Sequence, residues 1–362
     1  MNAQLPIQDQ VREAVKRTVG PTADLGAVKR LAGHASSRSY WRVGTPPCSA
    51  VVMVMPPDAK PEEVTKGGAR AELPFIEVQR YLDSLGVRVP RVLSWLAAEG
   101  LMVLEDLGDE MLETRLSGPP IRAGGADRSP REVLYELAID GLARLRAAAE
   151  AKPDPANVAF TRSFDADLYG WELWHFVEWG LEAWKGAKLS AAERELVTRH
   201  FEGIARTLAA EPKGFTHRDY QSRNLMVLPA EGGGAELAVI DFQDALLGPR
   251  QYDLVALLRD SYVELEPEFV DRMLRRWLTR FREAGGPALD YSAFRAGFDL
   301  LTVQRKLKDA GRFVFIDRVK KNPDFLVSIP ASLRYVRDAF ARRPDLAELQ
   351  AVLARHVPEL AD

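Results

Sequence analysis

Residues 215–244 read FTHRDYQSRNLMVLPAEGGGAELAVIDFQD, and this stretch decides how the chain folds. Two short apolar runs, residues 225–228 and 236–240, flank the turn-forming segment AEGGGA, which predicts a β-hairpin. Asp219 and Asn224 precede the first run, and Asp241 ends the second. A hairpin returns the chain to its starting point, so we expect these three side chains to work at one site.

The order of these residues matches the pattern H-R-D-x-x-x-x-N followed by a strand-end Asp, which is typical of kinase catalytic loops. Phosphoryl transfer from ATP needs a carboxylate near the attacking hydroxyl and oxygen ligands for Mg²⁺. We therefore expect Asp219 to orient or deprotonate the acceptor hydroxyl. We expect Asn224 and Asp241 to bind Mg²⁺. A lone His-Arg-Asp or a strand-end Asp arises by chance, but the three matches in order argue against coincidence.

With this motif the chain resembles the aminoglycoside phosphotransferase superfamily, the small-molecule branch of the kinase-like fold. Residues 248–254 (GPRQYDL) follow Asp241 too closely for a protein-kinase activation segment, and no Ala-Pro-Glu is present. The resemblance implies an α+β, bilobal fold. Residues 1–107 would form a small sheet-containing nucleotide-binding lobe, and residues 108–362 a mainly helical lobe with the catalytic loop and the acceptor site. It also implies that Asp253, with His217 and Arg218, supports the catalytic loop.

Hydrophobic periodicity gives a matching outline of helices and strands. In the first part it predicts helices at 8–19 and 72–85 and strands at 27–31, 39–43, 50–55 and 101–104. Residues 117–130 are rich in Gly, Pro and Ser, and are expected to be a loop or linker. After the linker, helices are predicted at 132–150, 167–185, 191–210, 266–284 and 291–310.

The nucleotide site follows from the resemblance. The segment GHASSR lies where the family places its phosphate-covering loop, although an ordinary Ser-rich turn would look the same. The adenine is expected to meet backbone groups at the end of the first lobe. The strand VVMVM lacks the Lys of protein kinases, so Arg38 or another cation replaces it, or nucleotide affinity is low. The expected nucleotide-binding residues are Gly33, Ser36, Ser37, Arg38, Glu105 and Leu107.

Within the superfamily, segments across residues 31–312 resemble the anomeric N-acetylmuramate/N-acetylglucosamine kinases of bacterial cell-wall recycling. The most specific are FQD at 242–244 and LLRDSY at 257–262. The implied reaction is ATP-dependent phosphorylation of the anomeric hydroxyl to the α-1-phosphate. Polar and aromatic residues on one helix suit a sugar, although such a helix is more often core. The expected substrate residues are Glu172, His175, Trp179, Arg223, Gln243 and Asp244.

Other acceptors and one other class of function stay open. An aminoglycoside or a choline-like alcohol would use the same machinery. The residues Gln304, Arg305, Lys306 and Lys308 suit the lactyl carboxylate of N-acetylmuramate, or else form a solvated basic face. The missing strand Lys would also fit a catalytically inactive binding protein on a kinase scaffold, although Asp219, Asn224 and Asp241 are all present.

Composition sets broader limits. The chain has 362 residues with a net charge of −3, which gives no sign of a nucleic-acid or membrane-surface partner. The single cysteine, Cys48, cannot form an internal disulfide, which fits a cytoplasmic protein. No uncharged run reaches the roughly 20 apolar residues of a membrane-spanning helix. We therefore expect a small-molecule sugar as the partner, and the sequence makes no prediction of the oligomeric state.

Overall fold

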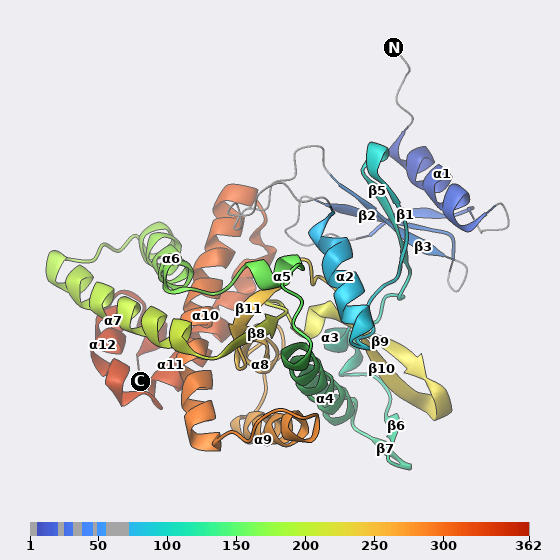
Figure 1. The fold of residues 1–362 in the computed structure, drawn as a ribbon. Helices are drawn as coiled ribbons and strands as arrows, with labels where there is room; N and C mark the ends of the chain where they lie inside the picture. Colours follow the sequence, from blue (N-terminus) through green and yellow to red (C-terminus); the bar gives the residue numbers. More distant parts are fainter. Residues whose placement is uncertain (1–5, 21–24, 32–37, 46–48, 56–71, 362) are drawn as a thin grey trace. The chain divides into compact units, whose positions relative to one another are not determined.

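The computed structural model describes residues 6–20, 25–31, 38–45, 49–55 and 72–361. The chain forms two compact units (Figure 1). The first consists of residues up to Glu110 together with Ala238–Gln243, and the second of Met111–Leu237 and the chain from Asp244 onward. The hairpin motif therefore contributes to both units: Asp219 and Asn224 belong to the second, and Asp241 belongs to the first.

The first unit contains a five-stranded antiparallel sheet in the order β1-β2-β3-β5-β4. The four strands predicted from the sequence are confirmed, and the sheet adds one that was not predicted, β4, whose VLSWL lacks a clear apolar alternation. The strands are β1 (Val28–Arg30), β2 (Ser39–Val43), β3 (Ala50–Val54), β4 (Val92–Leu96) and β5 (Leu101–Glu105).

In the part of this unit that the structure describes, two α-helices accompany the sheet, α1 (Ile7–Val19) and α2 (Pro74–Ser84), close to their predicted bounds. Helix α1 packs Val11, Ala14 and Val15, at helical spacing, against buried residues of the sheet. Burying a valine side chain in this way is worth about 2 kcal/mol. Helix α2 supports the other part of the unit, because the rings of Phe75 and Phe242 lie 4.8 Å apart beside Asp241.

The second unit is mainly helical, as predicted for the larger lobe. Its long helix α10 continues to Lys320, beyond the predicted end at 310, because Phe313, Val314 and Ile316 are also buried. The helices are α3 (Leu112–Arg115), α4 (Pro130–Ala151), α5 (Val158–Thr161), α6 (Ala166–Phe176), α7 (Ala191–Ala210), α8 (Tyr252–Leu258), α9 (Pro267–Glu283), α10 (Tyr291–Lys320), α11 (Ile329–Phe340) and α12 (Ala347–His356).

Three short antiparallel strand pairs complete the fold. The predicted hairpin is confirmed as β9 (Leu225–Ala230) and β10 (Gly234–Val239). The expected loop at 117–130 is wrong in part, because it contains the hairpin β6 (Ile121–Ala123) and β7 (Ala126–Arg128). Gly124 and Gly125 both have positive φ there, as a two-residue hairpin turn of type I′ requires. The third pair joins β8 (Lys213–Thr216) to β11 (Leu246–Pro249).

The helix predicted at 167–185 is interrupted. Helix α6 ends at Phe176 and continues as a π-helical segment, Val177–Ala183. Gly180 lies against the Phe176 ring, where a Cβ would come within 2.5 Å of ring atoms, so no larger residue fits without a shift. Short π segments in helices are frequent at functional sites, and this one carries Trp179.

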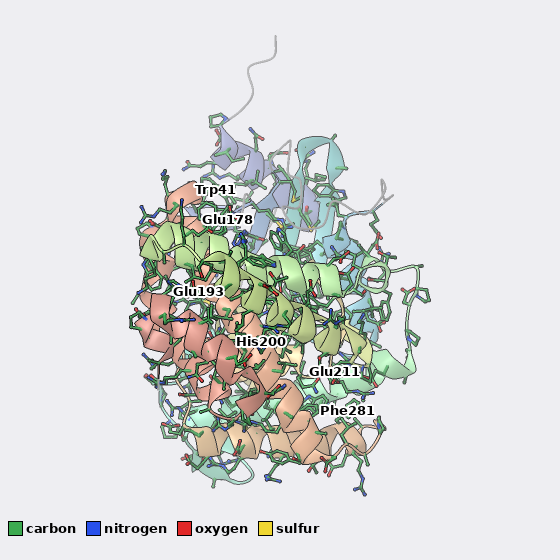
Figure 2. All side chains as sticks on the ribbon, turned by 90° about the vertical axis from the view of Figure 1, so that its left-hand side faces the viewer. Trp41, Glu178, Glu193, His200, Glu211 and Phe281 are labelled. Atoms are coloured by element: carbon green, nitrogen blue, oxygen red, sulfur yellow. The ribbon has the colours of Figure 1, made fainter. Side chains whose placement is uncertain are left out.

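Helix α7 illustrates how the helices outside the site are fixed. It begins with a capping box in which Ser190 Oγ accepts from the Glu193 N–H at 3.3 Å and Glu193 accepts from the Ser190 N–H at 2.9 Å. Figure 2 labels Glu193 and Glu211 near its two ends, with His200 between them. His356 of α12 lies 3.3 Å from Glu193, which ties α12 to α7. None of the described helices is long and apolar enough to cross a bilayer.

Candidate active site

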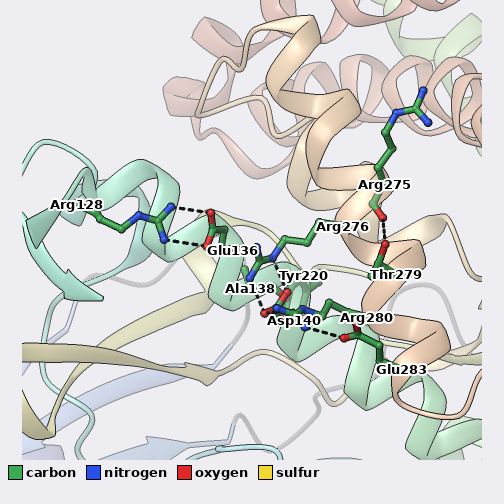
Figure 3. Close-up of polar contacts among 10 residues, drawn as sticks. All are labelled: Arg128, Glu136, Ala138, Asp140, Tyr220, Arg275, Arg276, Thr279, Arg280 and Glu283. Carbon is green, nitrogen blue, oxygen red and sulfur yellow. Dashed lines mark hydrogen bonds and ion pairs between the residues drawn. The ribbon is translucent and has the colours of Figure 1, made fainter. Parts of the chain in front are cut away.

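The strand pair β8–β11 leads into the catalytic loop, residues 217–224, and helix α4 fixes both. Arg146 of α4 is only 3% exposed and donates to the carbonyl oxygens of Phe215 at 3.2 Å and Gly248 at 3.0 Å. The Tyr220 hydroxyl donates to the Ala138 carbonyl at 3.0 Å. Figure 3 shows this bond beside the ion pairs that join α4 to α9, such as Arg276 with Asp140.

Asp253 holds the start of the catalytic loop. One carboxylate oxygen accepts from the His217 N–H at 2.8 Å, and the other accepts from the Arg218 N–H at 3.0 Å. Burial raises the pKa of Asp253, although these two backbone donors favour its ionised form. Arg218 has φ of 77°, a left-handed conformation that costs a non-glycine residue about 1 kcal/mol or more. The Asp253 carboxylate therefore holds the loop in a strained shape.

Asp219 lies in the middle of the loop with its side chain 40% exposed. Its N–H donates to Nδ1 of His217 at 3.3 Å, and its carbonyl accepts from Nδ2 of Asn224 at 2.8 Å. On the side chain, Oδ1 accepts from Nη2 of Arg305 at 3.1 Å. The main chain and one carboxylate oxygen of Asp219 are thus fixed, while the side chain still reaches the surface.

The charge around Asp219 is mostly positive. Burial alone would raise the pKa of this carboxyl, but the charges of Arg305, Lys308 and Arg218 outweigh burial and bring the pKa below its usual value. Asp219 is therefore ionised at neutral pH and can accept a hydrogen bond from an approaching hydroxyl.

Two of these cations, Arg305 and Lys308, come from one stretch of α10, which is not a solvated face. Arg305 and Lys306 are each 2% exposed. Arg305 lies over the Tyr252 ring at 4.8 Å, and its buried Nε and Nη1 have no hydrogen-bond partner among the described residues. Lys306 and Lys308 share Asp309, at 2.7 and 3.0 Å. The alternative of a solvated basic face is therefore wrong for this part of the helix.

The substrate residues predicted on the helix at 167–185 fall on α6 (Glu172, His175) and on the π-helical segment after it (Trp179), and they lie in two settings. Glu172 is 1% exposed, and its Oε2 accepts from Nε2 of Gln304 at 2.7 Å. His175 stacks on Trp171 with ring centroids 5.3 Å apart, and Trp179 packs edge-on against Phe315 at 5.1 Å. The structure thus places Glu172 inside the helix packing and the other two in an aromatic cluster, of which Trp171 is 48% exposed.

The contacts of Arg223 and of its neighbour Ser222 were not predicted from the sequence, which assigned only Arg223, to the substrate. The Arg223 guanidinium makes two bonds to Glu113 of α3, at 2.6 and 3.0 Å, and lies 3.6 Å from the Tyr262 ring. Ser222, beside it, donates to Asp260. Neither Asp260 nor Arg305 was assigned to the loop from the sequence. The available signals were the specificity of the segment LLRDSY, which contains Asp260, and the basic run at 304–308, which contains Arg305.

Asp241 is described within the first unit. Its φ of 65° makes it, with Arg218 and Lys321, one of three non-glycine residues of positive φ in the described chain. Gln243 donates to Asp241 Oδ1 at 2.7 Å and is 5% exposed, and Asp244 follows in the same turn. Strained backbone tends to occur at functional sites, and two of the three positions fall in the predicted motif.

The predicted nucleotide residues are only partly described. Gly33, Ser36 and Ser37 lie outside the described residues, and Arg38 and Leu107 are half-buried. The Glu105 N–H donates to the Arg91 carbonyl at 3.0 Å, so this N–H is already engaged. Its carboxylate pairs with Arg88 at 2.7 Å. Burial raises the pKa of Glu105, but Arg88 and Arg91 outweigh burial and lower it.

Comparison with curated proteins finds several near-full-length relatives. The chain is 34% identical over 88% of its length to an N-acetylmuramate/N-acetylglucosamine kinase of Pseudomonas aeruginosa, and covers 86% of that protein. It is 32% identical to proteins of the same name from Neisseria meningitidis and Caulobacter vibrioides. These matches cover 94% and 96% of the chain, and 93% and 97% of those proteins.

Comparison with solved structures finds the same fold. A choline/ethanolamine kinase family protein from Mesorhizobium loti aligns over 98% of this chain and 99% of its own, with a TM-score of 0.55 and 17% identity. The GDP complex of an aminoglycoside 2'-phosphotransferase aligns over 92% and 99%, with a TM-score of 0.58 and 14% identity. The family model described as the phosphotransferase enzyme family matches residues 27–291. The chain therefore belongs to the phosphotransferase enzyme family.

Proposed function

We propose that this chain is an ATP-dependent kinase that phosphorylates the anomeric hydroxyl of N-acetylmuramate or N-acetylglucosamine, giving the α-1-phosphate. The observation that carries the proposal is the match to kinases of these two sugars over nearly the whole length of both chains. The described site is compatible with this reaction, because an ionised, partly exposed carboxylate, Asp219, is held in a rigid loop.

In this proposal Asp219 accepts a hydrogen bond from the acceptor hydroxyl and orients it for attack. The phosphoryl-transfer transition state is loose, so positioning matters more than strong basicity, and an ionised carboxylate of low pKa suffices. Arg305 holds one oxygen of Asp219 and leaves the other for the hydroxyl. Asp253, His217 and Arg218 keep the loop in the required shape.

The residues assigned to Mg²⁺ fit that ion in their donor atoms. Asn224 commits its amide nitrogen to the Asp219 carbonyl, so the amide oxygen is the end that remains for a cation. Asp241 supplies a carboxylate that Gln243 orients. Mg²⁺ prefers such oxygen ligands, and when bound it neutralises phosphate charge during transfer.

The remaining assignments are part of the same proposal. The nucleotide phosphates are assigned to Gly33, Ser36, Ser37 and Arg38, and the adenine to backbone groups of Glu105 and Leu107. The sugar is assigned to Glu172, His175, Trp179, Arg223, Gln243 and Asp244. Residues 1–107 bind the nucleotide and residues 108–362 carry the acceptor site. The need for ATP and the lone cysteine favour the cytoplasm.

A coupled assay of ADP release tests the acceptor. The purified chain is incubated with Mg·ATP and, in separate reactions, N-acetylmuramate, N-acetylglucosamine, an aminoglycoside and choline. The proposal predicts ADP release above the acceptor-free background for at least one of the two sugars. Release with the aminoglycoside or choline alone would contradict it.

A further inference from the structure

The segment that follows α8, residues 260–262, contacts the second half of the catalytic loop. Asp260 is 1% exposed, and its Oδ2 accepts from both the N–H of Ser222, at 2.8 Å, and its hydroxyl, at 2.6 Å. The other oxygen, Oδ1, accepts from the Tyr262 N–H at 3.0 Å. A buried carboxylate thus uses both its oxygens on backbone donors, one of them in the catalytic loop.

Ser222 begins the turn Ser222–Asn224, which presents two of the predicted site residues. Asn224, at its end, donates to the Asp219 carbonyl at 2.8 Å. The guanidinium of Arg223, in the middle of the turn, lies 3.6 Å from the centre of the Tyr262 ring. The N–H of Tyr262 in turn donates to Asp260. Asp260 therefore reaches this turn by two routes, directly through Ser222 and indirectly through the Tyr262 ring.

The main chain around Asp260 has supports that do not involve its carboxylate. The Tyr335 hydroxyl lies 3.3 Å from the carbonyl oxygens of Asp260 and Val263. The Ser261 hydroxyl contacts Ser332 at 2.8 Å and Lys306 at 2.7 Å. A buried carboxylate is costly when its purpose is only to hold its own segment. The carboxylate of Asp260 is therefore most simply explained by what it holds in the loop.

We propose that Asp260 is a positioning residue that fixes the Ser222–Asn224 turn, and with it the Asn224 amide, relative to Asp219. It complements Asp253, which holds the other end of the same loop from the start of α8. This inference rests on the proposed function in one respect, the assignment of Asn224 to Mg²⁺. It predicts that losing the Asp260 carboxylate impairs turnover and magnesium-dependent nucleotide binding more than binding of the sugar.

The experiment compares Asp260→Ala, Asp260→Asn and Ser222→Ala with the parent chain. Asp299→Asn is the matched control, because Asp299 is also buried, at 3% exposed, but accepts from Arg295 at 3.0 Å. Asp241→Ala gives the reference for loss of the magnesium contribution. For each variant, calorimetry measures ADP binding with and without Mg²⁺. Steady-state kinetics gives kcat and the sugar KM, and thermal melting gives the folded fraction.

We expect Asp260→Ala to lower kcat by about 10- to 100-fold, the range for losing charge-assisted hydrogen bonds that position a catalytic group, with the sugar KM changed by no more than about twofold. Asp260→Asn keeps an acceptor oxygen for the Ser222 N–H, so its kcat should fall less than that of Asp260→Ala. The kcat of Ser222→Ala should fall least of the three. The gain in ADP affinity on adding Mg²⁺ should shrink in the same order. Asp299→Asn should lower thermal stability without changing that gain.

Two results would overturn the inference. One is Asp260 variants whose folded fraction retains the parent kcat and the parent gain in ADP affinity with Mg²⁺. The other is an equal loss of kcat and of the gain in ADP affinity with Mg²⁺ in Asp299→Asn, which would show that Asp260 contributes only to packing. If Asp260→Ala does not fold, the measurements on Asp260→Asn and Ser222→Ala test the inference. If the parent phosphorylates no amino sugar, the proposed acceptor is wrong, whereas the calorimetric comparison still judges Asp260.

Discussion

Two arginine–aspartate pairs with a buried arginine, one in each unit, are built differently. In the first unit, Arg42 lies 2.6 Å from Asp106 and 2.7 Å from Asp109, and Asp106 also accepts from Ser49 and from the Gly108 N–H. In the second, Arg305 makes one bond to Asp219, and its Nε and Nη1 have no partner among the described residues. Asp106 is 4% exposed in its side chain and Asp219 40%.

The difference gives a criterion for separating a structural ion pair from a candidate functional one. A buried carboxylate contributes to a defined fold when several donors satisfy it, as at Asp106, and Arg42 leaves only Nε without a hydrogen bond among the described residues. The pair at Asp219 is incomplete and partly open to solvent, which suits a carboxylate that has to meet a ligand. Changes at Asp219 and Arg305 should therefore affect turnover, and changes at Arg42 should affect stability.

The largest expected effect is that of Asp219→Asn. The amide keeps the shape of the carboxylate but loses its charge and its ability to accept the hydroxyl proton. We expect kcat to fall by about 1,000-fold, within the range for a general base, with Mg·ADP binding retained. Kinetics together with calorimetry measures both quantities. Turnover near that of the parent would remove Asp219 as the catalytic carboxylate.

The variant Arg305→Met tests the Asp219–Arg305 pair by removing the arginine. Methionine fills a similar volume but no longer holds Oδ1 of Asp219, so we expect kcat to fall by about 10- to 100-fold. The free energy of unfolding should change little, because two unpaired buried donors are removed at the same time. Urea unfolding followed beside kinetics checks this. A large loss of stability with normal turnover of the folded fraction would make Arg305 a structural residue.

Arg42→Met should show the opposite result. It leaves Asp106 buried without its cation, which is expected to lower the free energy of unfolding by about 3 kcal/mol. The kcat of the folded protein should stay within about twofold of the parent. Urea unfolding at neutral pH gives the stability, and Arg131→Met, at a pair with Glu266 near the surface, is the control. A stability equal to that control would show that the Arg42 pair is dispensable.

The smallest effect concerns pH and Glu105. Arg88 and Arg91 lower the pKa of Glu105 in the folded chain. The stability gained from these ion pairs is therefore present at pH values above the pKa that Glu105 has in the unfolded chain, and it is lost as the pH falls through its pKa in the folded chain. Glu105→Gln should therefore reduce stability at pH 7 by about 1 kcal/mol or less, and the difference from the parent should diminish in acid. Thermal melting from pH 7 to 3 measures this. A constant difference would exclude ionic pairing as its source.

Much of the fold could be predicted because its signals are local. The apolar runs around AEGGGA predicted the β9–β10 hairpin, and AVVMV predicted the central strand β3. The β6–β7 hairpin was not predicted, because Gly124 and Gly125 lie in a stretch whose composition indicates a loop. The strand pair β8–β11 escaped because it joins short segments on either side of the hairpin motif.

From the sequence, candidate site residues could be assigned only where they form one motif. Asp219 and Asn224 are separated by a few residues, and their spacing carries the information. Arg305 reaches Asp219 across 86 residues, and Asp260 reaches Ser222 across 38. Helical periodicity does not distinguish a buried arginine from a solvated one, so the basic stretch of α10 had two interpretations. The packing of α10 in the structure decides between them.

The central claim is that this chain transfers phosphate from ATP to the anomeric hydroxyl of an amino sugar through Asp219. The most direct measurement is ³¹P NMR of the product formed from Mg·ATP and N-acetylmuramate or N-acetylglucosamine, for the parent and for Asp219→Asn in parallel. We predict a new phosphate resonance coupled to H1 of the sugar with the parent, and no detectable product over the same time with the variant. A phosphate at another hydroxyl, or equal product from the variant, would contradict the account.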